Sequence, residues 1–210
     1  AKTLYRLHGL PVAPWEMARR EDIDVPARLL AKLRLPLVVK PVRQGSSIGM
    51  SIVRESSALG PSLAKAFEHD REVMVEQYIK GREITVGVIG NDEPVALPLV
   101  EIIPDKKYEF FDYEAKYQPG ATREVCPAEV DDEIRAKAQR YGLTAHRALQ
   151  LRGYSRTDMI VCGDEVYLLE TNTIPGMTPT SLLPQAAAVA GLPFPALLDR
   201  LIDLALEKQR

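Results

Sequence analysis

The chain has 210 residues, 46% of them hydrophobic and 27% charged, a composition typical of a folded globular protein rather than a disordered one. Its 27 Lys and Arg residues against 29 Asp and Glu residues give a formal net charge of -2, so the charge balance indicates no nucleic-acid partner. No apolar run approaches the roughly 18 residues of a membrane span, and the 2 cysteines form neither a disulfide framework nor a metal-ligand spacing, so we expect no membrane partner and a cytoplasmic setting.

The first half of the chain alternates short apolar runs with polar turns. Residues 26–35 space their leucines like an amphipathic helix with Pro26 in its first turn, and residues 57–69 repeat the helical spacing. The other apolar runs are rich in Val, Ile and Leu, and we predict strands over 35–40, 50–54, 72–79, 83–90 and 93–103.

The second half opens with a polar stretch, 104–129, which is too long for a simple connection and therefore indicates a functional loop. Residues 130–151 have the acidic start and the period of a long helix. Two strands, 155–163 and 165–172, precede a Pro- and Gly-containing loop and a mostly helical tail. Because helical and strand segments alternate, the fold class is α/β or α+β.

A small-residue loop follows the strand that ends near Lys40. The sequence VKPVRQGSSIGMS, residues 39–51, places Gly45, Ser46 and Ser47 where several backbone N–H groups could point at one anion, and Lys40 adds a point charge. The loop matches neither a Walker motif nor G-x-G-x-x-G. It is therefore either a phosphate-binding loop or a flexible hairpin turn, and Lys40 is either a ligand or a solvated strand end.

Four polar side chains alternate along the two strands near the C-terminus. Because residues two apart on a strand share a face, Arg156 and Asp158 point one way, and so do Glu170 and Asn172. A hairpin turn centred on Asp164 sets Asp158 opposite Glu170. The same register sets Arg156 opposite Asn172.

This register needs an irregularity, because a two-residue turn at 163–164 sets Asp158 opposite Leu169 instead. If the carboxylates of Asp158 and Glu170 do face each other, they repel, and something must compensate. Either Arg156 neutralises one carboxylate, or a cation lies between them, and oxygen ligands suit Mg²⁺. The remaining alternative is an exposed polar sheet face without a ligand.

The segment VEQYIKGRE, residues 75–83, connects two predicted strands. Its backbone groups could read an adenine edge, with Glu83 on a ribose hydroxyl. Surface carboxylates are the alternative explanation of Glu76 and Glu83.

The loop TIPGMTPTS, residues 173–181, leads into a helix at about Ser181. A helix N-terminus binds carboxylates well, and Gly176 permits close backbone approach. An ordinary loop with Ser181 as helix N-cap explains the pattern equally well. His8, His69 and His146 form no constellation, and the sequence carries no serine or cysteine nucleophile signature.

In chain order, these motifs resemble the D-alanine–D-alanine ligase family of the ATP-grasp superfamily. The resemblance rests on VKPVRQGSSIGMS, VEQYIKGREITVGVIG, FFDYEAKY, GYSRTDMIV and YLLETNTIPGMTPTSLLPQAA, and it covers nearly all of the chain. It implies the α+β ATP-grasp fold, in which two subdomains, here 1–82 and 83–210, grip ATP.

The resemblance also implies the nucleotide and metal ligands. The residues matching the ATP-binding positions are Lys40, Gly45, Ser46, Ser47, Glu76, Gln77, Tyr78, Ile79, Glu83, Phe110 and Lys116. Of these, Gly45 to Ser47 would cover the phosphates, Glu76 to Ile79 would form the adenine hinge and Glu83 would bind the ribose. Asp158, Glu170 and Asn172 match the ligands of Mg²⁺ or Mn²⁺.

Further matches concern the amino-acid substrates. Arg156 and the Gly176 backbone match the groups that stabilise the tetrahedral intermediate, and Ser181 and Leu182 match the part that binds the carboxylate of the acceptor D-alanine. Ser46 and Tyr117 match members of a triad that closes a lid over the substrates. Tyr117 also favours an amine acceptor over the hydroxyl acceptor of depsipeptide-forming relatives.

The implied activity is ATP- and Mg²⁺-dependent joining of two D-alanines through an acyl phosphate, a step of peptidoglycan precursor synthesis. Family members carry an N-terminal domain of roughly a hundred residues that this chain lacks, and their full-length enzymes form homodimers. We therefore expect the C-terminal two-thirds of a ligase, which binds nucleotide without turnover. The alternatives are a nucleotide-binding fragment or module without catalysis and an ATP-grasp ligase of other substrate specificity.

Overall fold

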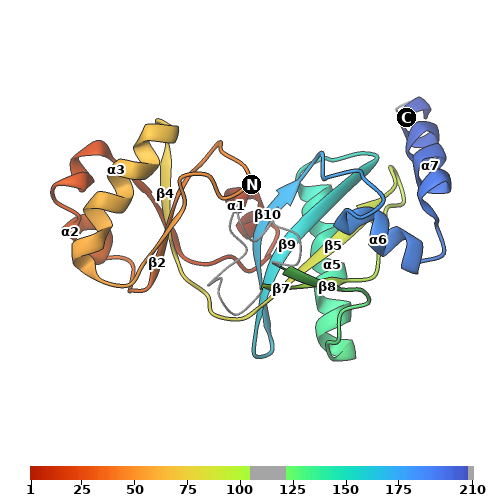
Figure 1. Cartoon of the computed structure of the whole chain (residues 1–210), viewed down its shortest axis with the longest axis horizontal. Coiled ribbons are helices and arrows are strands. Elements are labelled where there is room, and N and C mark those ends of the chain that lie inside the picture. The colour runs from red at the N-terminus through yellow and green to blue at the C-terminus, as the bar shows by residue number, and fades with distance from the viewer. Residues whose placement is uncertain (105–121, 208–210) are drawn as a thin grey trace. The chain divides into compact units, whose positions relative to one another are not determined.

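The computed structural model of the chain describes residues 1–104 and 122–207, so the predicted site residues Phe110, Lys116 and Tyr117 lie outside it. The chain divides into two compact units (Figure 1). Residues 13–79 form the small unit, and residues 1–12, 80–103 and those from Arg123 onward form the large unit. The first twelve residues thus group with the large unit, and the predicted subdomain boundary at residue 82 stays a prediction.

The small unit contains an antiparallel sheet and its covering helices. Its elements are β1 (Trp15–Ala18), η1 (Arg20–Ile23), α2 (Ala27–Leu30), β2 (Leu37–Pro41), β3 (Ser51–Val53), η2 (Ser56–Ala58), α3 (Leu59–His69) and β4 (Val73–Gln77). The strand order is β1-β4-β2-β3. The strand pairs β1–β4, β2–β4 and β2–β3 are all antiparallel.

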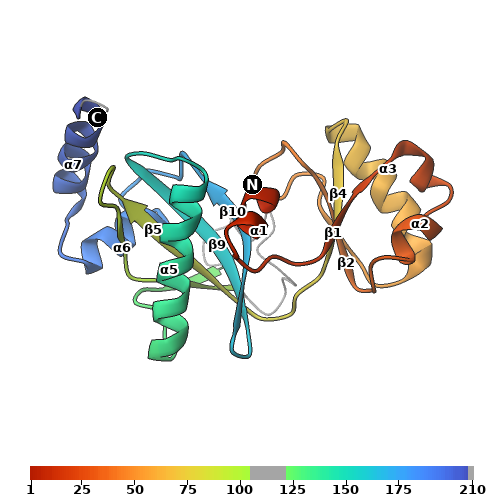
Figure 2. The same cartoon turned by 180° about the vertical axis from the view of Figure 1, so that it is seen from behind.

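The two faces of this sheet differ in chemistry. Leu37 and Val39 point toward the helices and are fully buried in a cluster with Leu63 of α3. The alternate position Lys40 therefore lies on the opposite face, and Figure 2 shows α2 and α3 on one side of the sheet. The small unit thus buries one apolar face under helices and keeps charged side chains on the other.

The large unit contains one sheet with helices packed against it. Its elements are α1 (Lys2–Leu7), β5 (Arg82–Ile89), β6 (Val95–Ala96), β7 (Val100–Pro104), β8 (Thr122–Val125), α5 (Asp132–Ala148), β9 (Tyr154–Cys162), β10 (Glu165–Asn172), α6 (Leu182–Val189) and α7 (Phe194–Leu206). Within the described residues the strand order is β10-β9-β5-β7-β8, and β6 pairs with β5. Separate helix and antiparallel-strand segments in both units confirm the α+β class.

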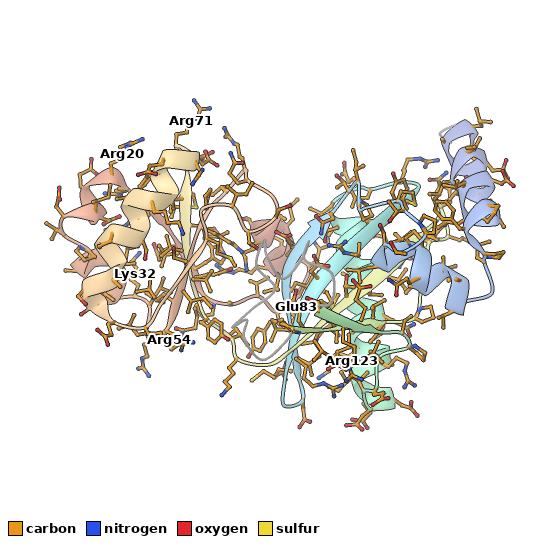
Figure 3. All side chains as sticks on the ribbon, viewed as in Figure 1. Arg20, Lys32, Arg54, Arg71, Glu83 and Arg123 are labelled. Carbon is orange, nitrogen blue, oxygen red and sulfur yellow. The ribbon has the colours of Figure 1, made fainter. Side chains whose placement is uncertain are left out.

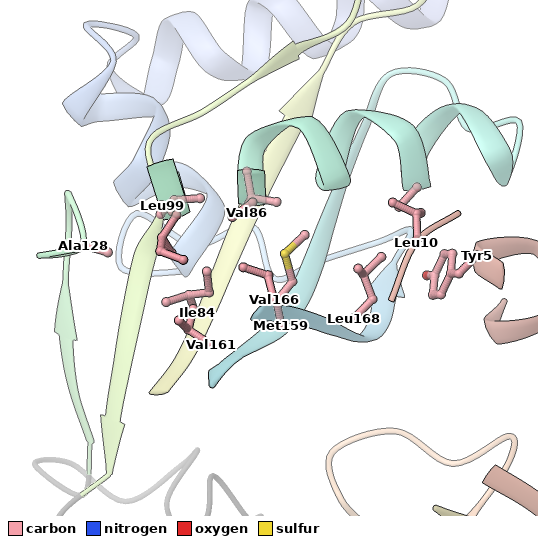
Figure 4. Packing of buried hydrophobic residues seen from close by; sticks show 13 residues of the cluster. Tyr5, Leu10, Ile84, Val86, Leu99, Ala128, Met159, Val161, Val166 and Leu168 are labelled. Carbon is pink, nitrogen blue, oxygen red and sulfur yellow. The ribbon is translucent and has the colours of Figure 1, made fainter. Parts of the chain in front are cut away.

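Helix α5 covers one face of this sheet (Figure 2). Ile84 and Val86 of β5 and Met159 of β9 are fully buried in one apolar cluster beneath it (Figure 4). Gly142 allows the close approach, because a Cβ there would lie 2.4 Å from Cγ1 of Val86. Strand alternation therefore directs the polar residues between these positions to the opposite face.

The N-terminal helix α1 was not predicted, and its one fully buried side chain explains its position. Tyr5 is 0% exposed, and its hydroxyl donates a hydrogen bond of 2.6 Å to Oγ1 of Thr171 on β10. The Thr171 hydroxyl lies 2.9 Å from that of Thr157 on β9. Burial raises the pKa of Tyr5, so the phenol stays protonated and donates.

Most predicted elements are confirmed, with shifted ends. The helix expected over 26–35 ends at Leu30 as α2, consistent with the non-helical preference of a residue such as Leu35 that precedes proline. The helical tail is broken into α6 and α7 by Gly191, whose φ is 86°, and by Pro193. Strands β1 and β8 were not predicted, and the strand expected over 93–103 is divided into β6 and β7. No helix of residues 1–104 and 122–207 has the length and apolarity needed to cross a bilayer.

One histidine of α5 is buried. His146 is 1% exposed, and its Nδ1 lies 2.8 Å from the hydroxyl of Ser155 on β9. Burial lowers the pKa of His146, and the neighbouring Arg147 acts in the same direction. The folded chain therefore holds this imidazole neutral, whereas the unfolded chain protonates it near its ordinary pKa of about 6.5.

We predict that this histidine makes the folded chain less stable in acid. Its folded pKa is the lower one, so its contribution is complete above about pH 6.5 and is lost as the pH falls toward the folded pKa, by up to about 1.4 kcal/mol per pH unit. Denaturant unfolding between about pH 7.5 and pH 5.5 measures how steeply the unfolding free energy changes with pH. This slope should be smaller in His146→Gln than in the wild-type chain. His8→Gln, at an exposed position, is the control. An unchanged slope in His146→Gln would contradict the assignment.

Candidate functional site

The hairpin of β9 and β10 carries the predicted facing carboxylates. The strands pair in simple register from Glu165 opposite Cys162 to Leu168 opposite Met159. The register then shifts at a bulge between Leu168 and Glu170. The two-residue turn and the predicted register therefore both occur, and one extra residue reconciles them.

Beyond the bulge, Glu170 lies opposite Asp158 and Asn172 lies opposite Arg156, as predicted. The Arg156 guanidinium donates to both carboxylate oxygens of Asp158, from Nε to Oδ1 and from Nη2 to Oδ2, each over 2.8 Å. Asn172 Nδ2 donates to Oδ2 of Asp158 over 3.0 Å. Burial alone would lower the pKa of Arg156, but the negative charge of Asp158 outweighs this and holds the pKa above its ordinary value.

One buried hydroxyl completes the contacts of Asp158. Thr85 of β5 lies opposite Asp158 in the ladder, and its Oγ1 donates to Oδ1 of Asp158 over 2.6 Å. Thr85 was not among the predicted site residues. The available signal was a polar residue inside the otherwise apolar strand ITVGVI, two positions after Glu83 and therefore on the same face.

The same face of β5 carries Glu83 at the start of the strand (Figure 3). Glu83 pairs with Ile160, two residues from Asp158 on β9, so its side chain emerges on the carboxylate face of the sheet. The structure thus brings six predicted or newly identified polar side chains to one sheet face, opposite α5. They are Glu83, Thr85, Arg156, Asp158, Glu170 and Asn172.

The donor set of this face suits a hard divalent cation. Two carboxylates and an amide stand on neighbouring strands, and oxygen ligands of this kind are those that Mg²⁺ prefers. Arg156 already neutralises Asp158, so the first of the two predicted forms of compensation is present. Loading a cation requires Arg156 to release a carboxylate oxygen and the Asn172 amide to turn its carbonyl inward. Within the described residues, no three His, Cys, Asp or Glu side chains form a metal group, so this face offers only its two facing carboxylates and the Asn172 amide.

In the small unit, two predicted nucleotide ligands form an ion pair. The Lys40 ammonium lies 2.5 Å from Oε1 of Glu76, and the two side chains are 19% and 4% exposed. Glu76 is therefore not the surface carboxylate of the alternative explanation, and Lys40 is not a solvated strand end. Both residues lie on the sheet face opposite α3, because Glu76 pairs with Val38 of β2.

The residues after Glu76 in the predicted adenine hinge are held by hydrogen bonds to two proline carbonyls. The Gln77 N–H donates to the Pro14 carbonyl over 2.8 Å, and its side-chain amide donates to the Pro36 carbonyl over 3.1 Å. The Tyr78 N–H also donates to the Pro36 carbonyl, over 3.1 Å. The hinge therefore has a fixed backbone, and Gln77 serves mainly to hold it.

The predicted phosphate loop joins the antiparallel strands β2 and β3, so it is a hairpin connection as the alternative held. Its backbone is unusual, because Ser46 and Ser47 have left-handed φ values of 54° and 58°. Such conformations cost free energy in residues other than glycine and gather at functional sites. Gly49 must be glycine, since a Cβ there would lie 2.6 Å from the His69 ring.

The loop before α6 brings its two predicted residues together. A Cβ on Gly176 would lie 3.0 Å from Oγ of Ser181. Ser181 occupies the N-cap position, but its hydroxyl accepts from the Thr178 N–H over 3.1 Å and makes no cap bond to the helix. The Leu182 side chain is buried, so only its N–H at the first helical position could face a ligand.

Comparison with known sequences identifies relatives of the whole chain. Residues 4–203 match the family model described as D-ala D-ala ligase C-terminus. The D-alanine–D-alanine ligases of Syntrophobacter fumaroxidans and Desulfotalea psychrophila are 59% and 52% identical to the chain, over 99% and 100% of its length. The alignments cover 67% and 66% of those proteins, so the chain spans about two thirds of the curated relatives it matches.

Solved structures agree with this match. The VanG D-Ala:D-Ser ligase from Enterococcus faecalis superposes with a TM-score of 0.87 at 36% identity, over 97% of this chain and 60% of that one. The D-alanine–D-alanine ligase from Bacillus anthracis complexed with ATP superposes with a TM-score of 0.79 at 33% identity, over 98% and 64%.

The facing carboxylates predict a large stability effect at Arg156. Arg156→Gln removes the guanidinium and leaves the facing carboxylates of Asp158 and Glu170 without a positive charge beside them. We expect the unfolding free energy to fall by about 3 kcal/mol. The double variant Arg156→Gln/Asp158→Asn should lose much less, because only one of the two facing side chains then carries a negative charge. Denaturant unfolding measures both.

The control is Arg135→Gln, which removes an exposed pair with Asp132 and should cost less than about 1 kcal/mol. If Arg156→Gln were as mild as this control, the ion pair would not be what compensates the ladder.

Proposed function

Because the chain belongs to the D-alanine–D-alanine ligase family and corresponds to its C-terminal ATP-grasp portion, we propose that it is the ATP-binding part of an enzyme that joins two D-alanines. The proposed setting is peptidoglycan precursor synthesis in the cytoplasm, where ATP is available. The observation that carries the proposal is the bulged register that sets Asp158 opposite Glu170 and Arg156 opposite Asn172.

The small unit would supply ligands for the phosphates and for the adenine. In the small unit, Lys40 and the loop from Gly45 to Ser47 would bind the phosphates, because a cation and left-handed backbone suit an anion. In the hinge, the N–H groups of Gln77 and Tyr78 are already donated within the unit. We therefore assign adenine recognition to Glu76 and to the N–H of Ile79.

Other groups would complete the nucleotide site. Glu83 would bind the ribose. From the residues outside the described range, Phe110 and Lys116 would reach over the nucleotide, and Tyr117 with Ser46 would close a lid over the substrates.

Asp158, Glu170 and Asn172 would hold Mg²⁺ or Mn²⁺, supported by their oxygen donor set and shared face. When bound there, the cation offsets the negative charge of the ATP phosphates during transfer. Arg156 keeps the neighbouring carboxylate oriented in the absence of the cation. Once released, its guanidinium is available for the negative charge that develops on the substrate.

The proposed reaction has two steps. A carboxylate oxygen of the first D-alanine forms a bond to the γ-phosphorus of ATP while the bond to ADP breaks, giving an acyl phosphate. The amine of the second D-alanine then attacks the acyl carbon and loses a proton, and phosphate leaves with the electron pair of the broken C–O bond. Arg156 and the Gly176 backbone would stabilise the tetrahedral oxyanion. Ser181 and the N–H of Leu182 would bind the acceptor's carboxylate.

Two alternatives remain testable. The first is a nucleotide-binding module without catalysis. A ligase with another acceptor is favoured by the structural match to a D-Ala:D-Ser ligase. The proposed partners of the whole enzyme are the N-terminal third found in relatives and a second copy forming a homodimer.

We predict that the 210-residue chain binds ATP with an affinity that Mg²⁺ increases. The double variant Asp158→Ala/Glu170→Ala should lose this increase, about ten-fold or more, because the cation loses two charged ligands. Calorimetric titration with and without Mg²⁺ measures both affinities. The matched control is Asp164→Ala/Glu165→Ala, which removes two exposed carboxyl groups at the far end of the same hairpin. Absence of ATP binding by the folded chain would contradict the proposal for this chain alone.

We also predict the acceptor. Joined to the N-terminal third of a relative, the chain should form D-alanyl-D-alanine faster than products from D-lactate or D-serine at neutral pH. Competition assays that resolve the products by mass measure the preference. A preference for D-lactate would overturn the assignment of Tyr117, and a preference for D-serine would favour the second alternative.

A further inference from the structure

We propose that Thr85 is a positioning residue of the cation site, whose hydroxyl fixes Oδ1 of Asp158 while the other partners of this carboxylate exchange. The inference rests on the proposed function, because it assumes that Asp158 binds a divalent cation. It adds a residue from a third strand, β5, to a site otherwise formed by β9 and β10.

Among residues 1–104 and 122–207, three side chains make four short contacts with the Asp158 carboxylate. Oδ1 accepts from Thr85 over 2.6 Å and from Arg156 Nε over 2.8 Å. Oδ2 accepts from Arg156 Nη2 over 2.8 Å and from Asn172 Nδ2 over 3.0 Å. A carboxylate held by so many donors must lose some of them before it can bind a cation.

Two of these three partners have other tasks in the proposed reaction. Asn172 would turn its carbonyl toward the cation, and Arg156 would turn its guanidinium toward the substrate. Thr85 has no such task. It is therefore the one contact of these three that persists in both the empty and the loaded site, and it keeps the carboxylate from swinging when the others leave.

The position of Thr85 suits a fixed anchor. It is 1% exposed on the central strand β5, directly opposite Asp158 in the ladder. As a β-branched residue on a strand it has little rotamer freedom, and its Oγ1 also lies 3.1 Å from the main-chain carbonyl of Thr157. The hydroxyl has one proton, and the charged acceptor at 2.6 Å is the stronger one.

A purely structural role would give a different result. If the hydroxyl only satisfied the Thr157 carbonyl, its loss would lower stability without changing cation affinity. Ser155 provides the matched control, because it is a fully buried hydroxyl on β9 that contacts His146 rather than Asp158. Ser155→Ala therefore removes a comparable hydrogen bond from the same sheet.

The test compares Thr85→Val, Thr85→Ser and Ser155→Ala in the 210-residue chain. Mn²⁺ binding in the presence of ATP is followed by electron paramagnetic resonance, and ATP affinity with and without Mg²⁺ by calorimetry. We expect Thr85→Val to weaken Mn²⁺ binding about ten-fold and to leave metal-free ATP affinity unchanged. Thr85→Ser, which keeps the hydroxyl, and Ser155→Ala should bind Mn²⁺ like the parent chain. Thr85→Ala replaces Thr85→Val if the valine variant does not fold.

Wild-type Mn²⁺ affinity in a folded Thr85→Val variant would overturn the proposal. If Asp158→Ala then still lost Mn²⁺ binding, the cation site itself would remain supported and only the role of Thr85 would fail. Equal weakening in Thr85→Val and Ser155→Ala would also overturn it, since the effect would then follow general destabilisation. If the parent chain binds ATP without any effect of Mg²⁺ or Mn²⁺, the cation site of the proposed function fails, and the role of Thr85 fails with it.

Discussion

The repulsion between two carboxylates that face each other across an antiparallel ladder is the constraint on which the arrangement of the large unit depends. Asp158 and Glu170 are held opposite by the backbone register, so they cannot separate without breaking the ladder. Arg156 offsets the charge with a two-point contact, and Thr85 adds a buried hydrogen bond from the next strand. The charges thus require polar partners on both neighbouring strands, which confines the apolar core to the other face of the sheet.

The bulge in β10 is what makes this division possible. Before it, Val166 and Leu168 alternate into the core beneath α5, and strict alternation would send residue 170 to the core as well. One extra residue reverses the alternation, so Glu170 emerges on the charged face and Thr171 turns inward. There Thr171 bonds to Thr157 and accepts from Tyr5, so the core face also closes with satisfied polar groups.

Much of this could be predicted from the sequence, because strands and helices each have a characteristic local spacing of apolar residues. The facing of Asp158 and Glu170 followed from strand periodicity and a turn at Asp164, and its need for an irregularity was visible in advance. What could not be predicted depends on contacts between distant residues. Thr85 meets Asp158 across 73 positions and Tyr5 meets Thr171 across 166, and no local pattern encodes either contact. Helix α1 was missed for the same reason, since its position depends on one buried tyrosine.

Buried charge alone does not identify the site. Arg82 and Glu101 form a two-point ion pair at 2.7 Å on the same sheet, with a further bond of 2.7 Å from Arg82 to the Glu129 carbonyl. That pair is complete, because the Glu101 carboxylate meets a guanidinium and faces Ile84, not a second carboxylate, in the ladder. At Asp158, one guanidinium serves two facing carboxylates, so the local charge remains negative. Replacing such a cluster with apolar residues is often neutral or stabilising, so the stability of the fold does not account for this cluster, and its excess negative charge supports the proposed cation site.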